Sequence, residues 1–326
     1  MNKETVNFLN ANLGKADWLM IPIKKGGSDR SFFRVSAAGQ KSFILMQYGV
    51  EKDENYCWLD IAGFLRGINV TVPGIFASDK KQRLVLMEDL GDVDLWSMRD
   101  KPWSKRRGCY QEVLAIIAKL HLLPLVSLPA DLKLMEGYGP TLYRWEQNYF
   151  LENFVGAVCK MELPDDFRYS LQDELNALTG RLLRVSPCLI HRDFQSQNIM
   201  IKNGKPVLVD FQGMREGLFF YDLGSLLYDP YVYLTPDEID ELLDFYYLLN
   251  NGGYGKEEFI SVFYDATAQR LMQALGAYGF LGLKKNKPDF LKHIKRGREN
   301  LLAATSGSPR LLRLHELAKS AEPAKI

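Results

Sequence analysis

The sequence has little of several features that mark particular classes of protein. Its 326 residues include four cysteines, Cys57, Cys109, Cys159 and Cys188, which lie far apart and form no CxxC pair. Neither a small disulfide scaffold nor a zinc site built mainly from cysteine is therefore expected. Its 41 Lys and Arg residues nearly balance its 40 Asp and Glu residues, which leaves a net charge of +1. That balance gives no general case for binding nucleic acid or an anionic membrane surface.

Long apolar runs are also missing. No stretch reaches the ~18 apolar residues that suggest a transmembrane helix, and the first residues are polar rather than signal-like. We therefore expect a cytoplasmic protein that does not act at a membrane. Hydrophobic residues make up 47% of the chain and charged residues 25%, which excludes disorder as the main state. At roughly 150 residues per domain, the length predicts about two domains.

The first part of the chain has the pattern of short strands. Residues 31–36 and 42–48 are β-prone runs joined by a short turn that contains Gly39, which predicts a hairpin. Apolar residues at helical spacing predict a helix over 54–68. Two further strands are predicted over 70–77 and 83–87.

After Asp94 the pattern becomes mostly helical. Predicted helices cover 104–122, 141–157, 165–185, 236–249 and 257–279, with one β-like segment over 188–209 and a helical tail over 307–325. We expect an α+β protein with two lobes: a small β-rich lobe over 1–88, a connecting segment over 89–92 and a larger, mostly helical lobe over 93–326.

The β-like segment carries the residues of greatest chemical interest. Asp193 and Asn198 lie five residues apart in a tight loop, and Asp210 ends the apolar run Pro206–Val209. A charged group at the end of a buried strand is costly without a partner, and a divalent cation is a natural one. Phosphoryl transfer needs one carboxylate beside the attacking hydroxyl, and an Asn and a second carboxylate for the metal. The spacing H-x-D-x-x-x-x-N followed by Asp fits these requirements.

These motifs resemble the aminoglycoside phosphotransferase and choline kinase superfamily, the small-molecule branch of the protein-kinase-like fold. The resemblance covers most of the chain and includes Ala118–His121 before the loop and the segment 217–227 after it. It implies Asp193 as catalytic base, Asn198 and Asp210 as ligands of Mg²⁺, and ATP as phosphoryl donor. It also implies a helix that Asp222 opens as N-cap.

A narrower resemblance is to the bacterial anomeric kinases of N-acetylmuramate and N-acetylglucosamine, which act in cell-wall recycling. It rests on His-Arg-Asp at 191–193, Asp-Phe-Gln at 210–212, and the segment 221–229. The start Ser-Asp-Arg-Ser-Phe-Phe-Arg at 28–34 and Gln269-Arg270 are similar as well.

The nucleotide site departs from the family at one position. Met46 stands in the third strand, where kinases of this fold usually carry a phosphate-binding lysine. The phosphate charge would then be offset by metal, by backbone groups near Gly27 and Ser28, and by Arg34 or another cation. The turn at Gly27 is equally consistent with an ordinary hairpin turn. By resemblance, Glu88 and Leu90 belong to the hinge that binds adenine.

Candidate substrate residues come from the matched segments. They are Asp29, Arg192, Gln195, Gln212, Glu216, Tyr221 and Arg270. Aromatic residues such as Tyr221 are candidates for stacking on a sugar, although aromatic clusters more commonly belong to a core. His191 is expected to brace the loop rather than to carry a proton.

The sequence therefore predicts an ATP-dependent small-molecule kinase whose acceptor is a sugar, in first place the C1 hydroxyl of N-acetylmuramate or N-acetylglucosamine. Two alternatives remain open. One is a kinase for an aminoglycoside or amino alcohol, since Glu216, Asp222 and Asp229 offer acidic groups for a cation. The other is a nucleotide-binding pseudokinase, which Met46 would favour and the intact Asp193, Asn198 and Asp210 would oppose.

Overall fold

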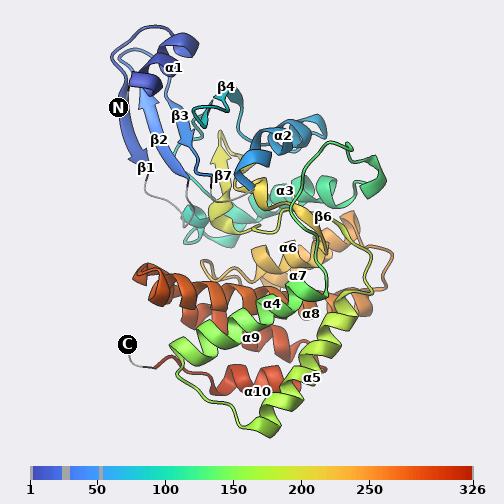
Figure 1. Cartoon of the computed structure of the whole chain (residues 1–326). Coiled ribbons are helices and arrows are strands. Elements are labelled where there is room, and N and C mark those ends of the chain that lie inside the picture. The colour runs from blue at the N-terminus through green and yellow to red at the C-terminus, as the bar shows by residue number, and fades with distance from the viewer. Residues whose placement is uncertain (1–2, 24–29, 51–53, 325–326) are drawn as a thin grey trace.

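The computed structural model describes residues 3–23, 30–50 and 54–324. Figure 1 shows a sheet flanked by short helices at the N-terminal end of the chain, standing above a larger body built mostly of helices. This arrangement confirms the predicted α+β fold with two lobes. The predicted division at 88 and 92 stays a prediction, although strand β5 ends at Glu88 and a short 3₁₀ helix begins at Trp96.

The smaller part is built on a five-stranded antiparallel sheet with the order β1-β2-β3-β5-β4. Its strands are β1 (Leu19–Ile23), β2 (Ser31–Ser36), β3 (Phe43–Gln47), β4 (Ile75–Asp79) and β5 (Leu84–Glu88), and its helices are α1 (Lys3–Leu13) and α2 (Glu54–Gly67). The predicted hairpin is confirmed as β2 and β3, with Ser31 opposite Gln47. The predicted helix over 54–68 is confirmed as α2.

Two strands differ from the prediction because of proline. Strand β4 begins at Ile75 instead of residue 70, after Pro73, which has no N–H to give to a ladder. Strand β1 was not predicted from its sequence, which contains Pro22. Proline is tolerated there because β1 lies at the edge of the sheet.

The larger part consists of helices around two small two-stranded ladders. Its helices are α3 (Trp103–His121), α4 (Pro140–Phe150), α5 (Asp165–Leu182), α6 (Phe219–Leu227), α7 (Pro236–Leu249), α8 (Lys256–Gly279), α9 (Ile294–Ser306) and α10 (Leu312–Ser320). The ladders pair β6 (Cys188–Ile190) with β9 (Arg215–Gly217) and β7 (Ile199–Lys202) with β8 (Lys205–Leu208). Short helical turns are η1 (Trp96–Met98), η2 (Leu125–Ser127), η3 (Leu151–Val158), η4 (Ser196–Asn198), η5 (Phe211–Gly213), η6 (Phe280–Lys284) and η7 (Pro288–His293).

Helix α7 shows how closely local chemistry sets an element's bounds. Its range is the predicted one, and it begins at a full capping box in which Thr235 and Glu238 each accept from the other's backbone N–H. The predicted helix over 141–157 is instead α4 continued by the π-helical turn η3.

Apolar packing connects the two parts through the loops that carry Phe194 and Phe211. One large core cluster runs from Met46 and Trp58 of the smaller part, through Phe194 and Phe211, to the helices of the larger part. The two ladders therefore pack against one continuous apolar core that both parts share. None of the helices in the described ranges is long and apolar enough to span a membrane.

Candidate active site

The loop after β6 brings the predicted base and the predicted metal ligands together. The side-chain amide of Asn198 donates to the backbone carbonyl of Asp193 at 2.9 Å. The backbone carbonyl of Asn198 in turn accepts from the N–H of Val209 at 3.0 Å, which places Asn198 one residue from Asp210 across the ladder. An amide that donates through its nitrogen keeps its side-chain oxygen for another partner. The three residues therefore lie in one small region.

Asp210 is held in an unusual backbone conformation. Its φ is 62°, in the left-handed region that non-glycine residues seldom adopt. The next residue, Phe211, is fully buried and stacks on Trp58 of α2, with the ring centroids 5.2 Å apart. The buried Phe211 fixes the turn and directs the half-exposed Asp210 carboxylate away from the core. Left-handed residues of this kind concentrate at functional sites.

A cation next to the predicted base keeps it ionised. Nη1 of Arg192 lies 2.7 Å from both carboxylate oxygens of Asp193. Burial works to raise the pKa of Asp193, but the charges of Arg192 and Arg270 and the hydrogen bond from Arg192 lower that pKa overall. Asp193 is therefore a carboxylate at neutral pH and can accept a proton. Arg192 itself has a φ of 77°, so the backbone bears strain at the residue that carries this guanidinium.

Asp222 of α6 fixes the loop that follows β6 through hydrogen bonds, a role that the sequence did not predict. Its two carboxylate oxygens accept the backbone N–H groups of His191 at 2.7 Å and Arg192 at 2.9 Å. Nε2 of His121 lies 3.0 Å from the same carboxylate. The prediction that Asp222 is an N-cap is wrong, because α6 begins at Phe219 and its N-cap is Leu218. In the sequence, the signal for this buried role is that Asp222 is the single charged residue of the apolar run 218–227.

His191 braces the loop, as expected. It is 1% exposed, and its Nε2 lies 3.1 Å from the carbonyl oxygen of Val209. Since a carbonyl can only accept, Nε2 carries the hydrogen. The contact ties the loop of Asp193 to the residue before Asp210.

The donor set fits a small, hard cation. Asp210 and Asn198 offer carboxylate and amide oxygens, which are ligands that Mg²⁺ takes alongside phosphate oxygens and water. No group of three or more His, Cys, Asp or Glu side chains in the described part of the chain could enclose a metal by itself. A site completed by the phosphates of a nucleotide is consistent with both observations.

The predicted nucleotide residues fall into three groups. Met46 and Leu90 are buried, and the Glu88 carboxylate lies 2.5 Å from Nζ of Lys202. Arg34 pairs with Asp89 at 2.7 Å and Asp92 at 2.8 Å, contacts that fit a residue bracing the predicted hinge better than a phosphate ligand. Gly27 and Ser28, and with them the predicted substrate residue Asp29, lie outside the described residues. A direct contact of any of these residues with a nucleotide stays a prediction.

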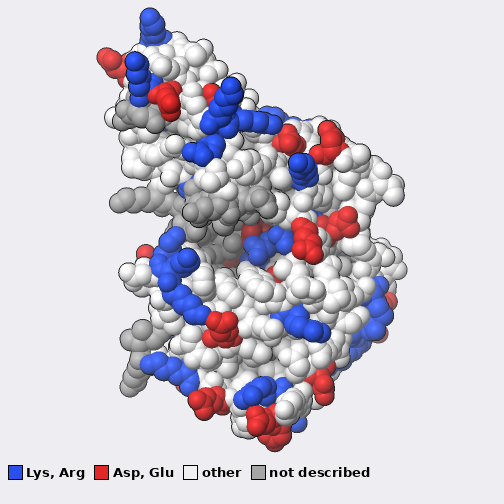
Figure 2. Space-filling view, in the orientation of Figure 1, with Lys and Arg blue, Asp and Glu red and all other residues white. Residues whose placement is uncertain are grey.

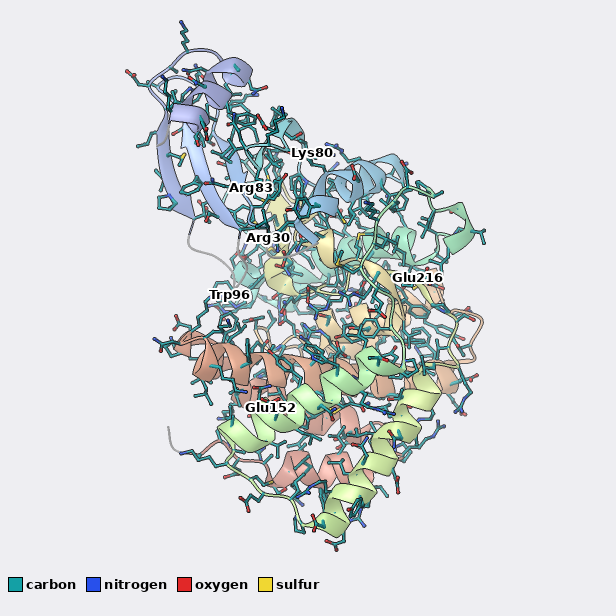
Figure 3. The ribbon with its side chains drawn as sticks, viewed as in Figure 1. Arg30, Lys80, Arg83, Trp96, Glu152 and Glu216 are labelled. Carbon is teal, nitrogen blue, oxygen red and sulfur yellow. The ribbon has the colours of Figure 1, made fainter. Side chains whose placement is uncertain are left out.

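The predicted substrate residues are only partly brought together. Arg192, Gln195 and Gln212 lie on the loops that carry Asp193 and Asp210, and Nε2 of Gln212 donates to Asp210 at 2.7 Å. Glu216 is exposed on β9, and Figure 3 shows it to the right of Arg30 rather than beside it. Figure 2 shows the surface hollowed between the two parts, with acidic and basic side chains gathered in the hollow.

Tyr221 and Arg270 belong to the packed interior. Tyr221 is 2% exposed and donates to Glu146 at 2.9 Å, so its ring does not offer a free face to a sugar. Arg270 is 4% exposed, with Nε on the Ser225 hydroxyl at 3.1 Å and Nη1 on the Gln273 side-chain oxygen at 2.8 Å. The positive charge of Arg270 helps to lower the pKa of Asp193, whereas Tyr221 is a neutral phenol that packs in the core.

Glu146 is a further residue that sequence reasoning missed. Its fully buried carboxylate accepts from the hydroxyls of Tyr138 at 2.8 Å and Tyr221 at 2.9 Å, and from the Gln269 amide at 3.0 Å. Burial raises the pKa of Glu146, while the nearby Arg192 charge and these donors oppose that rise. The signal for a buried role of Glu146 was its position on the apolar face of the predicted helix over 141–157.

Comparison with known proteins also indicates a phosphotransferase. A model of the phosphotransferase enzyme family (APH) matches residues 20–260. N-acetylmuramate/N-acetylglucosamine kinases from Pseudomonas putida and Pseudomonas aeruginosa are each 24% identical to this chain. The first alignment covers 89% of this chain and 84% of the relative, and the second covers 92% and 88%.

Solved structures show the fold. A choline kinase from Cryptosporidium parvum aligns with a TM-score of 0.62 at 14% identity, covering 96% of this chain and 99% of the other. The ADP-bound aminoglycoside phosphotransferase APH(2'')-Ib aligns with a TM-score of 0.59 at 13% identity, covering 97% and 99%. These structures confirm the protein-kinase-like fold expected from the motifs. The family model and the kinase-named relatives confirm a phosphotransferase with an alcohol acceptor. With most of its length matched by the family model, this chain belongs to the phosphotransferase enzyme family.

Proposed function

We propose that the protein transfers the γ-phosphoryl group of ATP to the anomeric C1 hydroxyl of N-acetylmuramate or N-acetylglucosamine. The observation that carries the phosphoryl-transfer chemistry is the convergence of Asp193, Asn198 and Asp210 through the two bonds of Asn198. The names of the relatives from two Pseudomonas species support the choice of acceptor.

Each residue of this group would have a separate task. Asp193 accepts the proton of the sugar hydroxyl while it orients that oxygen toward the γ-phosphorus. An ionised carboxylate has about four lone-pair sites, so Asp193 can receive a hydroxyl while it keeps its bond to Arg192. An anomeric hydroxyl is more acidic than an ordinary alcohol, so a carboxylate of lowered pKa suffices as base.

Asn198 and Asp210 would hold Mg²⁺ through their side-chain oxygens. When bound, the cation supplies charge neutralisation for the phosphate oxygens. The fixed backbone of Asp210, buttressed by the stack of Phe211 on Trp58, keeps the carboxylate in place before nucleotide binds. Most of the rate enhancement would therefore come from positioning and electrostatics.

The test is the release of ADP from ATP and Mg²⁺ with N-acetylmuramate, N-acetylglucosamine, other hexoses, choline and an aminoglycoside as acceptors. We expect turnover with the amino sugars, lowered about 10²- to 10⁴-fold in Asp193→Asn. Asp240→Asn, an exposed residue of α7, is the matched control and should leave turnover unchanged. Turnover with the cationic acceptors alone would refute the acceptor class. Nucleotide binding without turnover on any acceptor would favour a pseudokinase.

A further inference from the structure

Two carboxylates from the region of α6 bind the loop that follows β6, at different points along it. Asp222, within the helix, accepts from the N–H groups of His191 and Arg192, directly before Asp193. Asp229 follows the end of the helix and binds further along the loop. Figure 1 shows α6 between β6 and α8, and it packs against both. The two carboxylates therefore hold different parts of the loop on one support.

Asp229 is 1% exposed, and both of its carboxylate oxygens accept hydrogen bonds. Oδ2 accepts from the backbone N–H of Ser196 at 2.8 Å and from the hydroxyl of the same residue at 2.5 Å. Oδ1 accepts from the backbone N–H of Tyr231 at 2.9 Å. Burying a carboxylate is costly without such donors. Asp229 is therefore an anchor for Ser196 rather than an acidic group that faces a cationic acceptor.

The segment that carries Asp229 is itself held by the interior of the larger part. The side-chain amide of Asn300, on α9, donates to the backbone carbonyl of Tyr228 at 2.8 Å. The ring of Tyr231 packs edge-on against that of His293, with the ring centroids 4.3 Å apart. The Asp229 carboxylate is thus fixed by groups outside the loop that it binds.

Ser196 is the first residue of η4, the turn that ends at the predicted metal ligand Asn198. The backbone N–H of Asn198 closes this turn by donating to the carbonyl of Gln195 at 2.9 Å. The side-chain amide of Asn198 donates to the carbonyl of Asp193, which leaves its oxygen for another partner. The direction of that oxygen depends on where the turn lies, and Asp229 fixes the first residue of the turn.

Asn198 is in this way held from both sides. Before it, Asp229 binds Ser196. After it, the carbonyl of Ile199 accepts from the backbone N–H of Leu95 at 2.8 Å. A ligand whose neighbours are fixed on both sides keeps its orientation before the metal binds, and groups of this kind commonly set metal affinity.

We propose that Asp229 is a positioning residue for the metal site: by holding Ser196, it directs the side-chain oxygen of Asn198 toward the Mg²⁺ that accompanies the nucleotide. The inference rests on the proposed binding of ATP with Mg²⁺ by this chain. It divides the work of the two carboxylates, since Asp222 acts next to the base and Asp229 acts next to a metal ligand.

The test measures the affinity for ADP in EDTA and over a range of Mg²⁺ concentrations, so that it needs no turnover. The readout is the Mg²⁺ concentration that brings the affinity halfway to its value at saturating metal. We expect Asp229→Asn to raise that concentration about ten- to hundredfold, and to leave the affinity in EDTA within about twofold. An amide has one acceptor oxygen, so it cannot serve the N–H groups of both Ser196 and Tyr231.

Two further variants frame this result. Ser196→Ala loses the hydroxyl but keeps the backbone N–H, so it should raise the Mg²⁺ requirement in the same direction by a smaller factor. Glu174→Gln is the matched control, because Glu174 of α5 also accepts two backbone N–H groups, those of Arg313 and Leu314, away from this loop. It should change neither the Mg²⁺ requirement nor the affinity in EDTA.

The two conditions also separate the possible failures. Retained affinity in EDTA shows that the nucleotide site is folded, so a loss confined to Mg²⁺ supports the inference. An unchanged Mg²⁺ requirement, or an equal loss of affinity with and without Mg²⁺, would overturn it and leave Asp229 as a support of the fold alone. If Asp229→Asn does not fold, Ser196→Ala decides by the same criteria. If Mg²⁺ left the ADP affinity of the wild-type protein unchanged, the proposed function would fail first and the inference with it.

Discussion

At the scale of single residues, the site depends on charges that are held in place by strained or buried neighbours. Arg192 and Asp210 both adopt positive φ, and both carry charged side chains. The carboxylate of Asp193 is ionised because of a cation on the adjacent residue rather than because it is solvated. If Asp193 is the base, as proposed, the charge of Arg192 sets the lower limit of the pH range over which it works.

Replacing Arg192 with Ala should shift the acid limb of the kcat/KM profile to higher pH. A base is active in its ionised form, and removal of a positive charge raises the pKa of the carboxylate. As the pH falls, activity of Arg192→Ala should therefore begin to drop at a higher pH than that of the wild-type enzyme. Arg192→Lys keeps the charge and should shift the limb less. Profiles with the same acid limb in all three proteins would show that Arg192 does not tune the base.

At the scale of elements, helices α4, α6 and α8 support the loop through buried polar contacts. Asp222 of α6 accepts hydrogen bonds from two backbone N–H groups of the loop. Glu146 of α4 accepts hydrogen bonds from side chains of α6 and α8. These carboxylates act on Asp193 through other residues. We expect replacement of Asp222 to affect mainly the position of Asp193, and replacement of Glu146 to affect mainly the stability of the protein.

Asp222→Asn should lower kcat about ten- to hundredfold while the KM for ATP stays nearly constant. An amide has one acceptor oxygen, so either the N–H of His191 or that of Arg192 would face a donor and remain unpaired, at a cost of about 1–3 kcal/mol. Steady-state kinetics against both substrates checks the split. A KM for ATP that rose in step with the fall in kcat would argue for general loosening of the fold instead.

Glu146→Ala should lower the free energy of unfolding by at least about 3 kcal/mol, because it leaves two hydroxyls and one amide without their acceptor. Urea denaturation measures the change. Glu146→Gln retains one acceptor oxygen and should cost less. A loss of stability no larger for Ala than for Gln would mean that these contacts contribute little.

At the scale of the whole molecule, the smaller and the larger part enclose the hollow that Figure 2 shows, and one continuous apolar core runs through both parts. Strands β2, β3 and β5, the main helices and the triplet Asp193, Asn198 and Asp210 were predictable because periodicity and short-range spacing encode them. Helix α9 was missed, since basic residues interrupt its apolar face. The contacts of Asp222, Glu146 and Asp229 join residues far apart in the chain, which no local pattern encodes.

The most direct test of the proposed reaction is ³¹P NMR of the product formed from ATP, Mg²⁺ and N-acetylmuramate or N-acetylglucosamine. The account predicts a sugar 1-phosphate whose phosphorus couples to the anomeric proton, and no product from the corresponding methyl glycoside, in which C1 has no free hydroxyl. A phosphate ester at another carbon, or equal product from the methyl glycoside, would contradict it.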